Sequence, residues 1–153
     1  MNMKTKFNLQ KLDTTNTEMV KAFFADVFTN EPWNDDWSDA EQLHNYILDL
    51  TSHANSLTLG FFDGDTLVAL SMGFIKHWYA GTEYVIDELC VSRIRQHEGI
   101  GTKFIQEIEN YIKGIGLKNI FLQTGRNVPA YEFYKKNGFT ELVDHVSFSK
   151  RLE

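Results

Sequence analysis

The chain has 153 residues, of which 42% are hydrophobic and 24% charged, and it contains one cysteine. A net charge of −6 argues against nucleic acid or an anionic membrane as partner, and a lone cysteine excludes an internal disulfide. No apolar run reaches membrane-spanning length and Met1–Leu12 is too polar for a signal peptide. We therefore expect a single cytoplasmic domain over residues 1–153.

The N-terminal third predicts a strand followed by two helices. Alternation over Phe7–Leu12 is typical of an edge strand, and an apolar stripe predicts a helix over Thr17–Phe28. Ser38–Glu41 has the sequence of a capping box, in which Ser38 would open a second helix that runs to about Thr51.

The middle of the chain predicts antiparallel strands. Ser56–Asp63 and Thr66–Trp78 flank an Asp-Gly-Asp turn, which is typical of a tight hairpin. A second turn leads into Tyr84–Val91, a run rich in Val, Ile and Leu that predicts a buried strand.

A strand, a glycine-containing loop and a helix N-terminus then follow in that order. The loop ends in Gly99 and Gly101, and a helical pattern begins at Ile100. Free N–H groups and the helix dipole favour an anion at such a point, and glycine lets it approach the backbone closely. The pattern suggests a phosphate-bearing ligand beside Asp87 and Glu88; the alternative is a plain strand-to-helix turn.

The C-terminal part completes a mixed sheet. We expect strands at Asn119–Thr124, Phe139–Leu142 and Val146–Leu152, and a helix at Val128–Asn137 that Gly138 ends. The element order is β-α-α-β-β-β-α-β-α-β-β. The predicted fold class is α+β, with a mixed, mostly antiparallel sheet flanked by helices.

Two segments of this chain resemble the GNAT superfamily of acetyl-CoA-dependent N-acetyltransferases. Gln96–Gly101 resembles the Gln/Arg-x-x-Gly-x-Gly/Ala signature, and Asn127–Phe139 is similar to Asn-x-x-Ala-x-x-x-Tyr-x-x-x-Gly-Phe. The resemblance covers about residues 55–145, and the predicted element order is also the GNAT order. Glu98 departs from the family pattern; because a carboxylate would repel a pyrophosphate, we expect its side chain to turn to solvent.

The resemblance implies an acetyl-CoA site. The edge of the strand at residues 89–91 would pair with the pantetheine amides, and the N–H groups of residues 96–102 would hold the pyrophosphate. Tyr134 takes the position of the family tyrosine that protonates the leaving thiolate; the alternative is that it is simply a core residue. The implied cofactor-binding residues are Leu89, Cys90, Val91, Gln96, His97, Glu98, Gly99, Ile100, Gly101, Thr102, Asn127 and Tyr134.

Asp87 and Glu88 are unusual in an apolar strand, because buried carboxylates are costly unless they are paired or used. Alternation sends them to opposite faces, so at most one faces a reacting amine unless a bulge intervenes. In spermidine/spermine acetyltransferases and some aminoglycoside 6'-acetyltransferases, an acidic residue at the position of Asp87 faces the amine. We therefore favour Asp87 as base or amine anchor, with Glu88 second; the alternative for both is a structural role.

The turn between the first two helices carries Trp33, Asp35, Asp36 and Trp37. Exposed tryptophans usually pack against or bind something. The turn is either a cap on the core or a lid, in which Trp33, Asp36 and Trp37 would join Asp87 around a cationic acceptor.

The leading hypothesis is an N-acetyltransferase for a small cationic amine of polyamine, aminoglycoside or amino acid type. A protein N-terminal or lysine acetyltransferase and a non-catalytic acyl-CoA-binding domain are the alternatives. We expect no metal, because no histidine or cysteine has a ligand spacing. The sequence leaves a homodimer open.

Overall fold

The structure, a computed structural model, describes residues 6–153, which form two compact units: one ending at Gln123 and one of Thr124–Glu153. The first unit is built on a five-stranded sheet in the order β1-β2-β3-β4-β5. Neighbouring strands are antiparallel except for β4 and β5, which are parallel. The strands are β1 (Phe7–Leu12), β2 (Ser56–Asp63), β3 (Thr66–Trp78), β4 (Gly81–Val91) and β5 (Asn119–Leu122).

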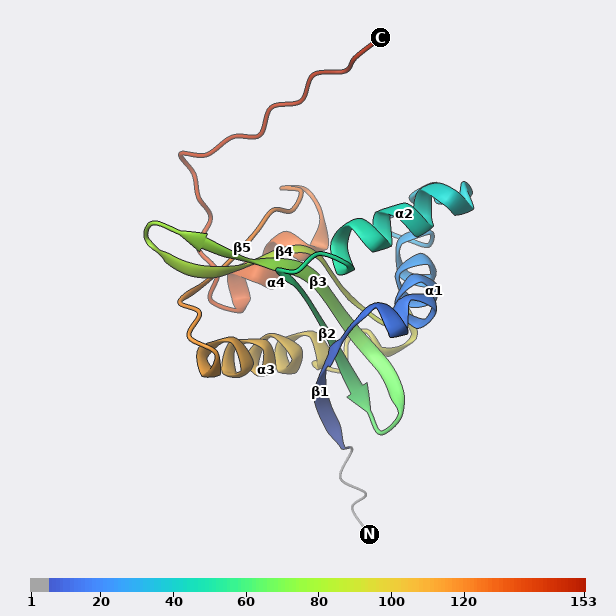
Figure 1. The fold of residues 1–153 in the computed structure, drawn as a ribbon, viewed down its shortest axis with the longest axis horizontal. Coiled ribbons are helices and arrows are strands. Elements are labelled where there is room, and N and C mark those ends of the chain that lie inside the picture. Colours follow the sequence, from blue (N-terminus) through green and yellow to red (C-terminus); the bar gives the residue numbers. More distant parts are fainter. Residues whose placement is uncertain (1–5) are drawn as a thin grey trace. The chain divides into compact units, whose positions relative to one another are not determined.

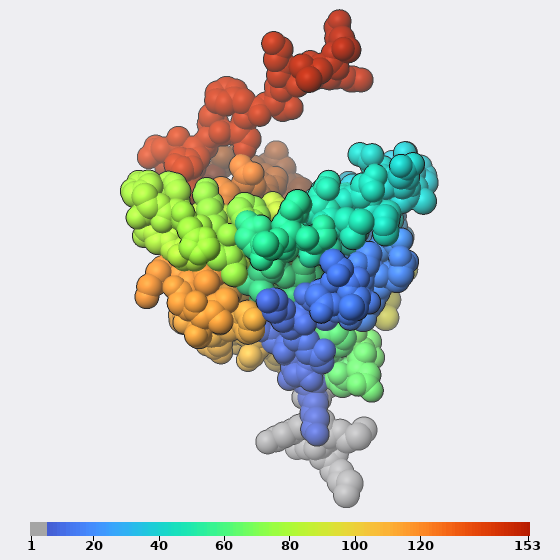
Figure 2. Space-filling view, in the orientation of Figure 1, coloured from blue at the N-terminus to red at the C-terminus, as the bar shows by residue number. Residues whose placement is uncertain are grey.

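Three α-helices cover the two faces of this sheet (Figure 1). α1 (Thr17–Phe28) and α2 (Ala40–Thr51) lie on one face, and α3 (Ile100–Gly114) lies on the other. In the space-filling view the blue surface of α1 and the teal surface of α2 lie side by side (Figure 2). Two short 3-10 turns, Thr14–Asn16 and Arg93–Arg95, precede α1 and α3. Among the described residues, no helix has the length and apolar character needed to cross a bilayer.

Each face of the sheet has its own hydrophobic core. The core on the α3 side includes Phe104 and Ile108 of α3 and, from the strands, Leu57, Leu59, Phe61, Tyr84 and Ile86. The core on the other side includes Val20 and Phe24 of α1, Ile47 of α2 and, from the strands, Leu70, Met72 and Cys90. Each fully buried large apolar side chain contributes about 1.5–3 kcal/mol, so the central strands are fixed from both sides.

The predicted helices and strands of the first unit are confirmed, but β4 begins earlier, at Gly81, β5 ends earlier, at Leu122, and the start of α2 is shifted. The capping residue is Asp39, whose Oδ1 accepts a hydrogen bond of 3.1 Å from the N–H of Gln42. The prediction of Ser38 as cap is wrong, because the Ser38 N–H instead donates to Asp36 Oδ1 at 3.0 Å and the helix begins one residue later.

The second unit contains α4 (Pro129–Lys136), which confirms the predicted helix. The predicted strands at Phe139–Leu142 and Val146–Leu152 are wrong: neither segment is in a strand. Alternation of apolar residues is only one requirement for a strand, because its backbone must also pair with a neighbour. Thr124–Glu153 contains no strand for these segments to pair with. The α+β fold class, with a mostly antiparallel sheet flanked by helices, is nevertheless confirmed.

Candidate active site

A β-bulge interrupts the pairing of β3 with β4. Met72 pairs with Glu88 but the next residue, Gly73, pairs with Ile86, so Asp87 is an extra residue without a partner across the ladder. A bulge shifts the alternation of side chains on the bulged strand by one position. Because of this shift, the side chains of Asp87 and Glu88 can lie on the same face of the sheet.

The contacts of both carboxylates confirm that they lie on the face covered by α2. The Tyr46 hydroxyl donates a 2.6 Å hydrogen bond to Glu88 Oε1, and Asp87 lines a cavity with side chains of α2. The flanking residues Ile86 and Leu89 pack into the core on the α3 side. Two adjacent carboxylates thus project toward the same helix.

Gly73 permits this arrangement by close approach of the backbones. A Cβ at Gly73 would lie 1.9 Å from the carbonyl oxygen of Val85 on β4, and any side chain would have to push the strands apart.

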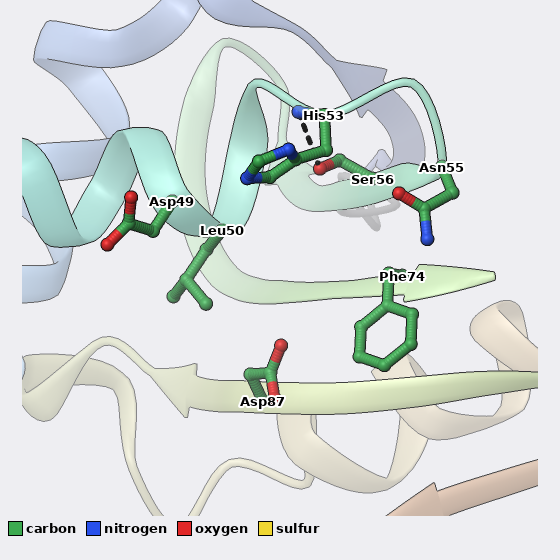
Figure 3. A pocket seen from close by; sticks show the side chains of 7 residues that line it. All are labelled: Asp49, Leu50, His53, Asn55, Ser56, Phe74 and Asp87. Atoms are coloured by element: carbon green, nitrogen blue, oxygen red, sulfur yellow. Dashed lines mark hydrogen bonds between the residues drawn. The ribbon is translucent and has the colours of Figure 1, made fainter. Parts of the chain in front are cut away.

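Asp87 faces a cavity of about 250 Å³ (Figure 3). The Asp87 carboxylate points from β4 toward Leu50 of α2, Phe74 of β3 stands beside it, and the His53 ring lies on the opposite wall (Figure 3). The lining consists of Asp49, Leu50, His53, Asn55, Ser56, Phe74 and Asp87. Two apolar side chains, Leu50 and Phe74, lie beside the acidic and polar ones, and this mixture suits an ammonium group carried on a partly apolar skeleton.

The two carboxyl groups differ in their surroundings. Partial burial raises the pKa of Asp87 above its ordinary value. Burial also raises the pKa of Glu88; the Tyr46 hydrogen bond opposes this effect, and the charges of Asp35 and Asp87 add to it. Four acidic or phenolic groups therefore act on one another here, and a cation would relieve their repulsion.

Asp87→Asn should stabilise the protein at neutral pH. Folding raises the pKa of this carboxyl above its value in the unfolded chain, which is near 3.8. The carboxyl therefore destabilises the folded protein increasingly as the pH rises from the unfolded-state pKa through the folded-state pKa. The penalty is therefore fully present at pH 7 and disappears in acid. Melting temperatures measured from pH 4 to pH 8 should show the largest increase of the variant over wild type near pH 8. A melting temperature below that of wild type at pH 7 would contradict this prediction.

The loop between β4 and α3 has the backbone geometry of an anion site. His97 and Gly99 have positive φ angles of 67° and 75°, and α3 begins at Ile100 immediately after Gly99. Alternating backbone conformations of this kind turn successive N–H groups toward one point, beside the positive end of the helix dipole. Among the described residues, apart from the glycine's chain neighbours and the backbone of its own helix, nothing lies within 4 Å of a Cβ built on Gly99, so that side of the loop is open. The loop therefore fits a pyrophosphate.

Arg95 neutralises the acidic residue of this loop. Its Nε lies 3.0 Å from Glu98 Oε2 and its Nη2 lies 3.1 Å from Asp63 Oδ2 at the end of β2. Glu98 is exposed, as expected, and its charge is paired. The ion pairs tie the loop to the β2–β3 hairpin and reduce repulsion of an anion.

One edge of β4 is available for pairing with an extended ligand. β5 pairs with β4 only from Glu83 to Ile86, whereas β4 continues to Val91. Beyond Ile86, no described strand pairs with this edge. Residues Leu89, Cys90 and Val91 lie on this stretch, which fits main-chain pairing with the amides of pantetheine.

Trp33 and Trp37 pack against the core beneath α1 and α2. The Trp33 ring centroid lies 5.5 Å from that of Phe28, and the Trp37 centroid lies 5.4 Å from Phe24 and 5.0 Å from Tyr46. Both tryptophans are half-buried. These contacts favour the core-cap alternative. Asp36 is exposed, and hydrogen bonding from the side chain and the N–H of Ser38 lowers the pKa of its carboxyl.

The second unit carries the other two residues that the resemblance implies. Tyr134 is half-buried in α4, and its ring makes edge contacts at 5.3 Å with Phe133 and with Phe139. Asn127 is exposed in the turn before α4. Tyr134 therefore has an aromatic environment that agrees with either a core or a catalytic role.

Two residues near the acidic pair were not predicted from the sequence. No local pattern in the sequence indicates the hydrogen bond of Tyr46 to Glu88, 42 positions away. His53 has no sequence pattern that indicates a site, yet it lines the cavity of Asp87. Within the described part of the chain, no group of three or more His, Cys, Asp or Glu side chains could hold a metal ion.

Comparison with known protein families identifies the family of this chain. A model of the acetyltransferase (GNAT) family matches residues 17–139. A search among curated proteins gives no significant match.

Several solved structures share the fold at low sequence identity. An aminoglycoside acetyltransferase from an uncultured soil metagenomic sample, in complex with sisomicin, has a TM-score of 0.73 and 20% identity, covering 96% of this chain and 97% of that chain. The aminoglycoside N-acetyltransferase AAC(6')-Iy in complex with CoA has a TM-score of 0.75 and 11% identity, covering 99% of each chain. A V. cholerae integron cassette protein has a TM-score of 0.78 and 13% identity, covering 97% of this chain and 94% of that chain. The fold expected from the sequence is thereby confirmed.

Proposed function

This chain belongs to the acetyltransferase (GNAT) family, and from that premise we propose that it moves an acetyl group from acetyl-CoA directly to a primary amine of a small cationic molecule. The observation that carries the proposal is the bulge in β4. It turns the Asp87 carboxylate toward a cavity just where the strand edge becomes free to pair with an extended ligand.

The chain's own groups would bind acetyl-CoA along β4 and the loop that follows. The backbone of Leu89–Val91 would pair with the pantetheine amides, and the N–H groups of Gln96–Thr102 would hold the pyrophosphate. Bound there, acetyl-CoA supplies an acetyl group activated as a thioester. The open space at Gly99 and the ion-paired state of Glu98 support this placement.

Asp87 would anchor and deprotonate the acceptor. A primary amine arrives mainly as an ammonium ion, and it must lose a proton before its nitrogen can attack a carbonyl carbon. The Asp87 carboxylate attracts the ammonium and can take that proton, directly or through one water. The raised pKa of Asp87 makes it a better proton acceptor than an ordinary aspartate.

Tyr134 would supply a proton to the departing sulfur. Its phenol and a thiol have comparable proton affinities, which suits transfer between them. Asn127 would hold the start of α4 beside the cofactor. Both roles rest on the family resemblance of Asn127–Phe139.

The acceptor class is a cation of polyamine, aminoglycoside or amino acid type. Acidic side chains at Asp35, Asp49, Asp87 and Glu88 support a cationic acceptor, and two solved relatives in fold are aminoglycoside acetyltransferases. One domain over residues 1–153 and a cytoplasmic location stay predictions.

A panel of amines incubated with acetyl-CoA, read by release of free thiol, tests the proposal. Cationic amines should be acetylated, and Asp87→Asn should raise their KM with little change in the KM of acetyl-CoA. KM for the amine should also rise with added salt, because part of the attraction is between formal charges. Acetyl-CoA binding without thiol release for any amine would favour the non-catalytic alternative, and release only with peptides would favour a protein acetyltransferase.

A further inference from the structure

Tyr46 connects the aromatic core of the first unit to the acidic pair on β4. Its hydroxyl donates the 2.6 Å hydrogen bond to Glu88 Oε1. Its ring stacks on Trp37, with centroids 5.0 Å apart and an interplanar angle of 20°, and lies 5.7 Å from the Phe24 ring. The ring is thus held on two sides, and its hydroxyl is fixed in direction.

We propose that Tyr46 is a positioning residue that keeps Glu88 as a fixed, ionised carboxylate and so leaves Asp87 as the group that receives the acceptor amine. The proposal rests on the function proposed above and assigns different roles to the two carboxylates. Tyr46 itself touches neither substrate in this assignment; it acts through Glu88.

The physical argument starts from the repulsion between two adjacent carboxylates. Two such groups on one face tend to share a proton unless their surroundings differ. Tyr46 supplies the difference, since a hydroxyl donating to a carboxylate stabilises the ionised form. Glu88 has this donor, whereas Asp87 has no hydrogen-bond or ion-pair partner among residues 6–153 and faces the cavity (Figure 3).

The burial of Tyr46 supports its role as a permanent donor. Burial, the hydrogen bond to Glu88 and the nearby acidic charges raise the pKa of Tyr46, so its hydroxyl keeps its proton throughout the physiological range. The Trp37 ring, stacked on Tyr46, limits rotation of the tyrosine ring.

Four titratable groups interact electrostatically with Glu88. They are Tyr46 on α2, Asp35 in the turn after α1, and Asp87 and Cys90 on β4. None of these is basic. The Tyr46 hydroxyl is therefore the group among them that favours ionisation of Glu88.

Tyr46→Phe tests the proposal in the full chain with an amine from the panel and acetyl-CoA. Loss of a hydrogen bond to a charged group should lower kcat/KM for the amine by about tenfold, while the KM of acetyl-CoA stays within about twofold. The acid limb of the kcat/KM profile should move to higher pH, because the active form in this proposal needs Glu88 ionised, and Glu88 without its hydrogen-bond donor takes up a proton at higher pH. Tyr111→Phe is the matched control: it removes a half-buried hydroxyl from α3, on the other face of the sheet, and should leave both parameters unchanged.

A double-mutant cycle separates action through Glu88 from a general packing effect. In the Glu88→Gln background, Tyr46→Phe should have little further effect on kcat/KM, and the acid limb should not move. An additive effect of the two changes, or a Tyr46→Phe variant equal to wild type, would overturn the proposal while leaving the acetyltransferase assignment intact.

A titration of the carboxyl carbons by NMR decides the same point without turnover. The midpoint of Glu88 should move to higher pH in folded Tyr46→Phe relative to wild type. An unchanged midpoint would refute the role of Tyr46, whether or not any amine is acetylated. Conversely, a shifted midpoint in a protein that acetylates no amine would refute the proposed function alone.

Discussion

Gly99→Glu should abolish the rise in melting temperature that acetyl-CoA gives the wild-type protein. A ligand at 100 times its dissociation constant stabilises the folded state by about 2.7 kcal/mol, which is readily measured as such a rise. Gly99 lies at the N-terminus of α3 with φ = 75° and open space around its Cβ position. A glutamate there would bring a negative charge to the point where the loop's N–H groups would hold the pyrophosphate.

Gly99→Gln is the matched control, because glutamine has the same size and suffers the same backbone strain as glutamate. Both variants should lose about 1 kcal/mol of stability from the left-handed conformation. The glutamine variant should nevertheless keep most of the acetyl-CoA effect in a thermal titration. Wild-type affinity for acetyl-CoA in a folded Gly99→Glu variant would show that the pyrophosphate binds elsewhere. An equal loss of acetyl-CoA affinity in both variants would show that the backbone conformation at Gly99, and not charge repulsion, controls binding.

Local patterns were sufficient to predict most of the first unit. The helical spacing from Ile100 onward and the hairpin at Asp63–Asp65 each depend on a few neighbouring residues, and both are confirmed. The anion-binding geometry of the β4–α3 loop follows from the same local information, since Gly99 stands where the left-handed conformation is needed.

The arrangement of the acidic pair depends on contacts that no local pattern contains. The bulge at Asp87 requires Gly73 on the neighbouring strand, because only a glycine lets the Val85 carbonyl approach so closely. The bond from Tyr46 to Glu88 joins residues from α2 and β4. Strict alternation would place the two carboxylates on opposite faces of the strand. The sequence therefore indicates that a shared face requires a bulge, but it does not show whether a bulge is present.

In the C-terminal segment, a local pattern predicts a strand that the structure does not contain. Val146, Phe148 and Leu152 would share one face of an extended strand, yet the segment has no strand to pair with in its own unit. Periodicity reports which side chains could share a face. It does not report whether a pairing edge is present.

Tyr134→Phe should lower kcat by about 10²–10⁴-fold while leaving the affinity for acetyl-CoA nearly unchanged. The change removes the hydroxyl group whose proton would pass to the departing sulfur. The ring should keep its edge contacts with Phe133 and Phe139, so α4 should fold as before. Single-turnover measurement with an acetylated amine is the appropriate readout, because slow product release could otherwise hide a loss in the chemical step.

Tyr131→Phe gives the control on the same helix. The Tyr131 hydroxyl donates a 2.8 Å hydrogen bond to Glu141, so its loss should lower the melting temperature slightly but leave the single-turnover rate unchanged. If Tyr134→Phe also kept a single-turnover rate within about twofold of wild type, far less than general acid catalysis provides, the hydroxyl could not be the proton donor. Water would then have to protonate the sulfur, and Tyr134 would serve α4 only through the packing of its ring.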